Sequence, residues 1–269
     1  MLAIAIERWN LHKRIALTII KLVGTNINKI ILGFMLATAF LSMWISNTAT
    51  AVMILPVGIA IILQLQDNPT TKKNENLIFG KALMLSIAYS ASIGGMATLI
   101  GTPPNLVLAG VVESTFNTEI TFFQWFLFGF TLSMILLFIC WMYLTKFAFK
   151  FEQKEFPGGK EEINRQLASL GSMSYEEKII AFVFSLTAIA WICRSFLLSL
   201  WIPAIDDTII AITGALLLFL IPNKDKSQAL LIWEDAVKLP WGILILFGGG
   251  MALATAFESS GLAIWIGSQ

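Results

Sequence analysis

Residues Leu41–Pro56 read LSMWISNTATAVMILP, and this stretch decides how the rest of the chain is organised. It lies inside a long apolar run, yet its centre holds four small uncharged polar residues, Ser46, Asn47, Thr48 and Thr50. Such side chains bond to nearby backbone in preference to continuing a helix, so they predict a helix break. Inside a bilayer, the backbone groups freed by a break are tolerated only where they face protein, water or a ligand. The alternative is a polar turn between two helices.

Composition sets the class of protein. The chain has 269 residues, of which 57% are hydrophobic and 13% charged, and its mean hydropathy is +0.79. Soluble domains carry about 25% charged residues, so we expect an all-α membrane protein with several spans. The net charge of +1 gives no indication of nucleic-acid binding. The only histidine, His12, lies in a polar-faced segment, and Cys140 and Cys193 lie in apolar runs, so neither a histidine metal site nor a disulfide framework is predicted.

A second interruption lies in the next apolar segment. Ala82–Gly101 is rich in small residues, runs into the sequence TPPN at Thr102–Asn105, and resumes as Leu106–Val112. Two successive prolines break a helix, so we expect a broken helix over 82–112. Two uncharged interruptions that are adjacent in the chain predict two halves of one site, lined by unwound backbone and half-helix ends.

The distribution of positive charge predicts the orientation. None of the 18 Lys and Arg falls in Glu113–Thr121, in Trp201–Thr208 or after Lys238. By the positive-inside rule, the basic loops lie on the cytoplasmic side of the cell (inner) membrane. These loops are 66–81, 146–178 and 223–238.

Both flanks of the Ser-Asn-Thr element are then cytoplasmic. The element is either two full spans with an external turn, or a re-entrant hairpin over 30–65. Each expected arm has about 16 residues, or about 24 Å at 1.5 Å per residue, which is short of the roughly 30 Å hydrocarbon core. We therefore favour the hairpin.

Two further segments carry charge near apolar residues. Leu11–Val23 has apolar residues at helical spacing with interleaved basic ones, which predicts a helix lying in the membrane interface. Arg194 lies about two turns from the end of a predicted span over 178–200. A membrane arginine is a candidate functional residue, but at this depth we favour a side chain that extends to the interface.

A weak internal repeat relates the two ends of the chain. LAIAIERWNL from Leu2 matches LATAFESSGL from Leu253, and the copies have opposite expected orientations, as inverted-topology repeats require. A counterpart of the Ser-Asn-Thr centre would fall at about position 297 by this offset, beyond Gln269, so we expect a truncated chain holding one complete half-site.

The motifs SxxxSNT at Ser42–Thr48 and GGxxTxxGTPPN at Gly94–Asn105, with LFGGGxALA at 246–254, resemble the divalent anion:sodium symporter family. These are Na⁺-coupled carriers of di- and tricarboxylates and of sulfate. The resemblance implies an inverted-repeat secondary transporter that acts by an elevator mechanism as a homodimer in the lipid bilayer. It also implies Na⁺ ligands and substrate-binding residues. The Na⁺ ligands are Ser42, Ser46, Asn47 and Gly101. The residues at the small anionic substrate are Asn47, Thr48, Thr102 and Pro103.

The same resemblance implies a division of the chain. Residues 1–29 would end one scaffold part and include the interfacial helix. Residues 30–145 would form half of the transport domain, with the hairpin over 30–65, the broken helix over 82–112 and a span over 122–145. Residues 146–177 would be a cytoplasmic loop, 178–257 scaffold spans of the second repeat, and 258–269 the start of a second hairpin region.

The sequence also allows other functions. Uncharged Asn and Thr donors suit sulfate as well as carboxylates, and related ion carriers share hairpins and inverted repeats. A proton-coupled carrier would need a titratable acid near the breaks, and the sequence has none there. No enzyme motif is present, so we expect a transporter that is not an enzyme. A fragment that lacks half the site, and does not transport, is the third possibility.

Overall fold

The computed structural model describes residues 1–24, 26–66, 73–151, 159–202, 204–239 and 241–268. The regular elements of these residues are helices, which confirms the all-α class. Parts of two expected loops, at 67–72 and 152–158, lie outside the described residues. The α-helices are α1 (Leu2–Arg8), α2 (Leu11–Val23), α3 (Ile27–Ser42), α4 (Asn47–Gln66), α5 (Lys73–Gly95), α6 (Pro103–Phe116), α7 (Phe122–Met142), α8 (Gly159–Ser169), α9 (Tyr175–Cys193), α10 (Ser199–Trp201), α11 (Asp207–Leu220), α12 (Trp233–Ala236), α13 (Trp241–Ser259) and α14 (Leu262–Gly267). Short π-helical turns follow α7 (Tyr143–Ala148) and α9 (Arg194–Leu198).

The chain divides into two compact units, Leu2–Leu230 and the residues from Leu231 onward. The first unit contains the four described segments that are long and apolar enough to cross a membrane. The second unit contains α12, α13 and α14. The membrane-spanning candidates are Asn47–Gln64, Asn76–Gly95, Phe122–Ala148 and Tyr175–Trp201.

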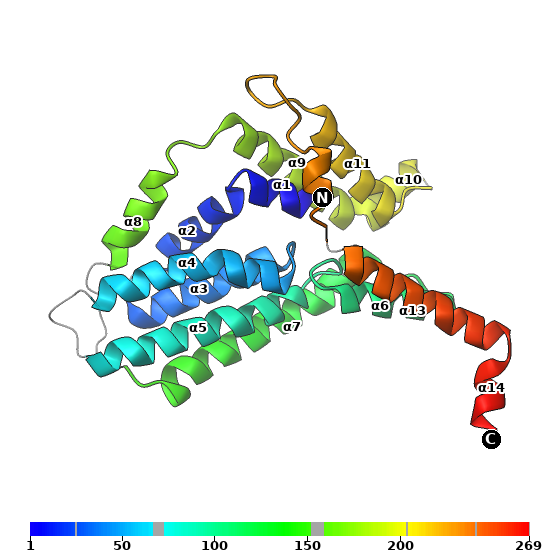
Figure 1. Ribbon diagram of the computed structural model, residues 1–269, viewed down its shortest axis with the longest axis horizontal. Helices are drawn as coiled ribbons and strands as arrows, with labels where there is room; N and C mark the ends of the chain where they lie inside the picture. Colours follow the sequence, from blue (N-terminus) through cyan, green and yellow to red (C-terminus); the bar gives the residue numbers. More distant parts are fainter. Residues whose placement is uncertain (25, 67–72, 152–158, 203, 240, 269) are drawn as a thin grey trace. The chain divides into compact units, whose positions relative to one another are not determined.

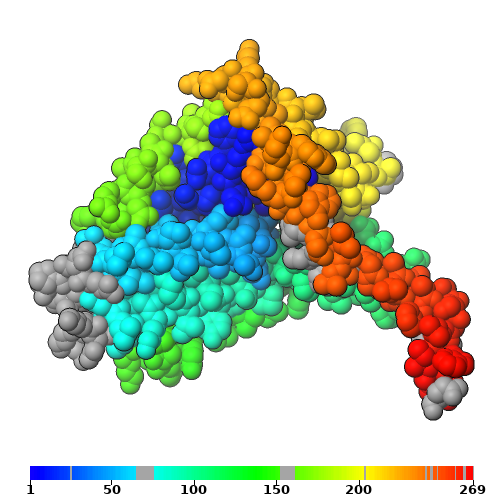
Figure 2. Space-filling view, viewed as in Figure 1, coloured from blue at the N-terminus to red at the C-terminus, as the bar shows by residue number. Residues whose placement is uncertain are grey.

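Helices α3, α4, α5 and α7 run side by side in the first unit, as Figure 1 shows. The space-filling view shows α4 and α5 in direct contact (Figure 2). Glycine allows α3 and α5 to approach closely, because a Cβ at Gly94 would lie 2.3 Å from the carbonyl oxygen of Ala39. A methyl group does not fit at that distance, so glycine at position 94 is a packing requirement.

The hairpin formed by α3 and α4 has unequal arms. Helix α3 has 16 residues, but α4 has 20, or about 30 Å at 1.5 Å per residue. The expected length of the second arm, about 16 residues, is therefore wrong, and length alone does not separate a hairpin from two spans. At the tip, Met43 and Ile45 are 4% and 5% exposed, whereas Ser46 and Thr48 are exposed. The choice between a re-entrant hairpin and two full spans therefore stays a prediction.

Helix α2 has the bounds expected of the interfacial segment, but the position of His12 was predicted wrongly. Its side chain is 3% exposed, and Nδ1 lies 3.2 Å from the carbonyl oxygen of Ile6. Burial lowers the pKa of His12 below its ordinary value, and the contact with the Ile6 carbonyl opposes this only in part. The reason for the error is the turn between α1 and α2, where Asn10 has a φ of 57° and the chain folds back over the histidine.

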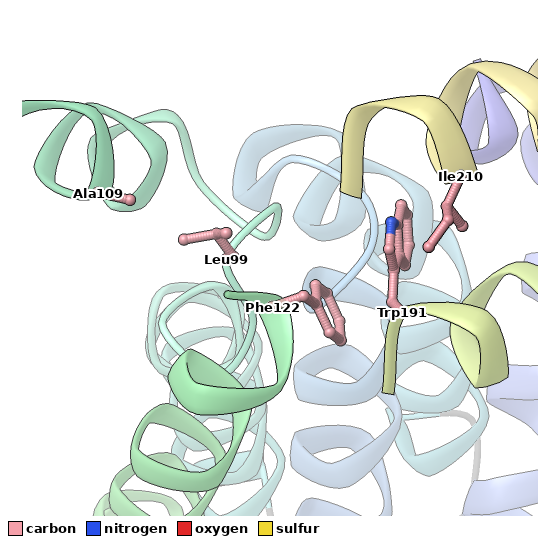
Figure 3. Packing of buried hydrophobic residues seen from close by; sticks show 5 residues of the cluster. All are labelled: Leu99, Ala109, Phe122, Trp191 and Ile210. Atoms are coloured by element: carbon pink, nitrogen blue, oxygen red, sulfur yellow. The ribbon is translucent and has the colours of Figure 1, made fainter. Parts of the chain in front are cut away.

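An aromatic cluster joins α7 to α9 and α11. Figure 3 shows Phe122 of α7 and Trp191 of α9 next to Ile210 of α11. The rings of Phe122 and Trp191 stack with centroids 5.0 Å apart, and both side chains are buried. Such pairs contribute about 0.5–1.5 kcal/mol beyond burial of area. This cluster therefore fixes α7 against α9 and α11.

The second unit contains an ion pair at α12 and one long helix, α13. Lys238 pairs with Asp235 at 2.9 Å at the end of α12, and α13 is a single helix of 19 residues. The side chain of Glu258, which the proposed repeat relates to Glu7, lies outside the described residues. The inverted repeat and the division into transport and scaffold parts stay predictions.

Candidate functional site

The tip of the hairpin is held by two serines. Ser42, the last residue of α3, is fully buried, and its Oγ lies 2.8 Å from Asn47 Oδ1 and 2.7 Å from the Ala91 carbonyl oxygen, so its single hydrogen is shared between two acceptors. Ser46 precedes α4, and its Oγ accepts a hydrogen bond from the Ala49 amide at 3.3 Å. A side-chain oxygen at this position satisfies an amide that has no partner within the helix. The polar sequence therefore both ends α3 and starts α4.

The second interruption separates α5 from α6 over residues 96–102. Pro103 and Pro104 occupy the first two positions of α6, where a missing N–H removes no intrahelical bond. Asn105 is buried, and its Nδ2 donates to the carbonyls of Gly95 at 3.0 Å and Thr98 at 2.8 Å. One side chain thus satisfies carbonyl groups on the unwound side of the break.

The two interruptions meet. The Thr98 hydroxyl donates to the carbonyl of Met43 at the hairpin tip. A Cβ at Gly95 would lie 2.2 Å from Asn47 Oδ1, and a Cβ at Gly101 would lie 2.5 Å from the Gly95 carbonyl oxygen. The tip and the break are therefore in direct contact, as half-sites of one site must be (Figure 1).

The structure gathers three of the four expected Na⁺ ligands around Gly95, namely Ser42, Asn47 and Gly101. The fourth, Ser46, is exposed, and its hydroxyl oxygen is occupied by the Ala49 amide. Its carbonyl accepts the Thr50 amide at 2.9 Å as the first hydrogen bond of α4.

The expected substrate residues lie at the starts of the two helices that follow the breaks. Thr48 in the first turn of α4 is exposed. Thr102 has extended backbone angles, φ −147° and ψ 144°, and its side chain does not cap α6. Thr102 and Pro103 are half-buried. Their roles toward a substrate stay predictions.

Three residues that join the two interruptions, Gly95, Thr98 and Asn105, belong to the quoted motif, but their contacts were not predicted. The signal for Asn105 was available, because an asparagine directly after two prolines at a helix start can reach back to the unwound carbonyls. Gly95 contacts Asn47, 48 positions away, and Thr98 contacts Met43, 55 positions away. No local pattern in the sequence identifies these partners.

The residues of this site carry no charge, which sets their chemistry. Hydroxyl, amide and carbonyl oxygens are the ligands that hard cations prefer. Within the part of the chain that the structure describes, no cluster of three or more His, Cys, Asp or Glu could hold a metal ion. The site is suited to a monovalent cation that gives up part of its water shell, with amide and hydroxyl donors beside it for an anion.

Arg194 lies beside the α6–α7 connection and the start of α11. The side chain is 12% exposed and pairs with Glu119 at 2.6 Å and with Asp207 at 3.3 Å. Its Nε donates to the Ile205 carbonyl at 3.1 Å. Folding brings acids from the α6–α7 connection and from α11 to the guanidinium. The extension of this side chain to the membrane interface stays a prediction.

The whole chain, residues 1–269, matches the family model described as the sodium:sulfate symporter transmembrane region. The sodium-dependent dicarboxylate transporter SdcS of Staphylococcus saprophyticus is 48% identical over 275 residues, which cover 100% of this chain and 53% of the relative. SdcS of Staphylococcus aureus strain USA300 has the same identity and coverage. The chain therefore spans about half the length of the curated relatives it matches.

Proposed function

The chain belongs to the sodium:sulfate symporter family, and on that premise we propose that the protein is a sodium-coupled symporter of a divalent anion. The proposed substrate is a di- or tricarboxylate, and the relatives named as sodium-dependent dicarboxylate transporters support it. The family membership confirms the resemblance inferred from the motifs and the expectation of a transporter in place of an enzyme.

One observation supports the proposal most directly. Ser42 Oγ and Asn47 Oδ1 lie 2.8 Å apart beside Gly95, where the hairpin tip meets the broken helix. A sodium ion coordinated by these oxygens and by the carbonyl oxygen of Gly101 in the unwound segment would have neutral oxygen ligands only. The proposed Na⁺ ligands are Ser42, Ser46, Asn47 and Gly101.

A neutral site also gives a physical reason for coupling. The bound Na⁺ makes the site positive, so a dianion next to it binds more tightly, and by reciprocal linkage the dianion strengthens Na⁺ binding. Donors for the anion would be the Asn47 amide and the hydroxyls of Thr48 and Thr102, with Pro103 beside them. A Lys or Arg at the centre is not required.

We extend the proposal to the mechanism. Residues 30–145 would move as one body against the scaffold from residue 178 onward, as in an elevator, and the protein would act as a homodimer. The aromatic cluster of Phe122 and Trp191 and the ion pair of Arg194 with Glu119 join these two parts. The basic loops 66–81, 146–178 and 223–238 would face the cytoplasm.

Sulfate transport is the second candidate, because the family description names it. Sulfate and a dicarboxylate carry the same charge, and uncharged hydroxyl and amide donors suit the oxygens of both. Uptake of labelled sulfate measured beside labelled succinate separates the two.

The test is uptake of labelled succinate, citrate and sulfate by proteoliposomes that contain the protein as its gene encodes it, with Na⁺ or with choline outside. We expect uptake that requires Na⁺, and loss of it in Asn47→Ala. Ser114→Ala, a change at an exposed residue of α6, is the matched control and should leave uptake unchanged. Asn47→Ala uptake equal to that of the wild type at all sodium concentrations would refute the proposal.

A further inference from the structure

Helices α3, α4 and α5 enclose a set of hydroxyl groups below the hairpin tip. Each of these side chains has no exposed surface, although its neighbours are mostly apolar. Ser42, Ser86 and Ser90 donate to backbone carbonyls at 2.6–2.7 Å. The five residues are Thr38, Ser42, Thr50, Ser86 and Ser90.

Thr38 and Thr50 differ from the other buried threonines inside the described helices, Thr145 and Thr187. Their hydroxyl groups are buried without a hydrogen-bond partner. In five other helical threonines the hydroxyl donates to the carbonyl four residues before it, at 2.7–3.1 Å. A buried hydroxyl without a partner is unfavourable, so packing by itself would favour valine at these two positions. The threonines that follow the usual pattern are Thr18, Thr131, Thr145, Thr187 and Thr255.

Position along the helices distinguishes the two threonines. Thr50 follows Asn47 by three residues on α4, and Thr38 precedes Ser42 by four on α3, so each shares a helix face with its neighbour at the site. Side chains on a helix lean toward its N-terminus. The N-terminus of α4 is at the tip and that of α3 is at the base of the hairpin. Thr50 therefore leans toward Asn47, whereas Thr38 leans away from Ser42.

We propose that the hydroxyl oxygen of Thr50 is a further ligand of the sodium ion at Ser42 and Asn47. This inference rests on the proposed function and adds a ligand that the motif does not contain. A hydroxyl is a hard oxygen ligand, and the cation would satisfy the lone pairs that the protein leaves without a partner. Thr50 also adds an oxygen to the coordination shell on the buried side of the ion. The Ser46 hydroxyl oxygen already accepts the Ala49 amide.

Electrostatic repulsion opposes a second ion at Thr50 beside the ion at Asn47. Two unit charges one helical turn apart, about 5.4 Å, repel by about 3 kcal/mol even at an effective dielectric constant of 20. One ion shared by Asn47 and Thr50 avoids this repulsion. Thr50 therefore belongs to the site at the tip and not to an independent one.

The experiment is a sodium titration of thermal stability. The purified protein as its gene encodes it is unfolded by heat at increasing NaCl, with choline chloride holding the ionic strength constant. Binding to the folded state raises Tm according to ligand concentration relative to Kd. We expect Thr50→Val to raise the Na⁺ concentration for half-maximal stabilisation about 10-fold or more, as for loss of one bond to a charged group. Thr50→Ser should restore the wild-type value.

Thr38→Val is the matched control, because Thr38 is equally buried and equally without a partner. Both valine variants should gain stability in choline chloride, since each removes a buried hydroxyl without a partner. Only Thr50→Val should lose sodium affinity. Thr50→Ala gives the same readout if the valine variant does not fold.

The possible results test the role of Thr50 and the proposed function separately. A wild-type protein whose Tm does not respond to Na⁺ contradicts the proposed function itself. A wild-type protein that Na⁺ stabilises, with Thr50→Val responding at the same sodium concentrations, overturns the role of Thr50 and leaves the proposed function standing.

Discussion

Replacing Asn105 with leucine tests the contact that shapes the broken helix. The leucine side chain is of similar size but has no donor, so the carbonyls of Gly95 and Thr98 lose hydrogen bonds of 3.0 and 2.8 Å. Both bonds cross the break, and Asn105 is 7% exposed. Water cannot replace the lost donor without opening the contact between α5 and α6.

The magnitude follows from the two bonds. Side-chain hydrogen bonds in membrane proteins contribute about 0.6 kcal/mol on average and up to about 1.7 kcal/mol. Two of them give a loss of about 1–3 kcal/mol in the free energy of unfolding. The Thr98 carbonyl also receives the Gly101 amide at 3.3 Å, so its loss is the smaller of the two.

Reversible unfolding in mixed micelles, followed by fluorescence of the nine tryptophans, measures this free energy. Ser114→Ala on the same helix is the control, because its exposed hydroxyl donates only to the Val111 carbonyl within α6. We expect the control to change stability by less than about 0.5 kcal/mol. An equally small change in Asn105→Leu would refute the assignment of Asn105 as the residue that holds the break.

Three further changes test the packing and charge of the first unit. Gly94→Ala should lower stability by about 1–3 kcal/mol in the same unfolding assay, because a methyl group there overlaps the backbone of α3. Gly80→Ala on α5 meets only ordinary contacts of 3.6 Å or more and should be tolerated. The buried His12 has a lowered pKa, so the unfolded chain binds its proton first and stability should fall as pH falls below about 6.5. His12→Gln should flatten this part of the pH profile. The double-mutant cycle of Arg194→Gln with Glu119→Gln should give a coupling below about 1 kcal/mol, because Glu119 is 49% exposed and solvent screens the pair. A larger coupling would show a more desolvated ion pair.

Several features of the fold follow from the sequence alone, for reasons of composition and local pattern. The apolar spans and the presence of two breaks depend on residue types that act on their own backbone. The positions of the breaks were predicted only in part, because the breaks lie at 43–46 and 96–102, whereas Asn47, Thr48 and Thr50 lie in α4 and Pro103–Asn105 begin α6. Small polar residues compete for nearby backbone groups, and proline removes a donor. The bounds of α2 follow from helical spacing, and the motifs around Asn47 were enough to identify the family.

The motif also predicted residues of the site, and two of them contact each other in the structure. Ser42 and Asn47 were named from their spacing, and their 2.8 Å hydrogen bond is a contact five residues apart in the chain. Asn105, Gly95 and Thr98 stand in the quoted motif, but the contacts that they make were not predicted. Their contacts depend on where α5 places its end against the tip, and that position follows from the close approach of α3 and α5.

The sequence by itself determined that this is a helical membrane protein of a sodium symporter family, and it predicted two uncharged interruptions in its apolar segments. Only the tertiary structure decided that the interruptions touch through Thr98 and Gly95, that Arg194 pairs with Glu119 and Asp207, and that His12 is buried. The physical reason is the range of the interactions. A helix break is encoded within a few residues, whereas partners 13 to 75 positions apart are brought together only when the helices pack.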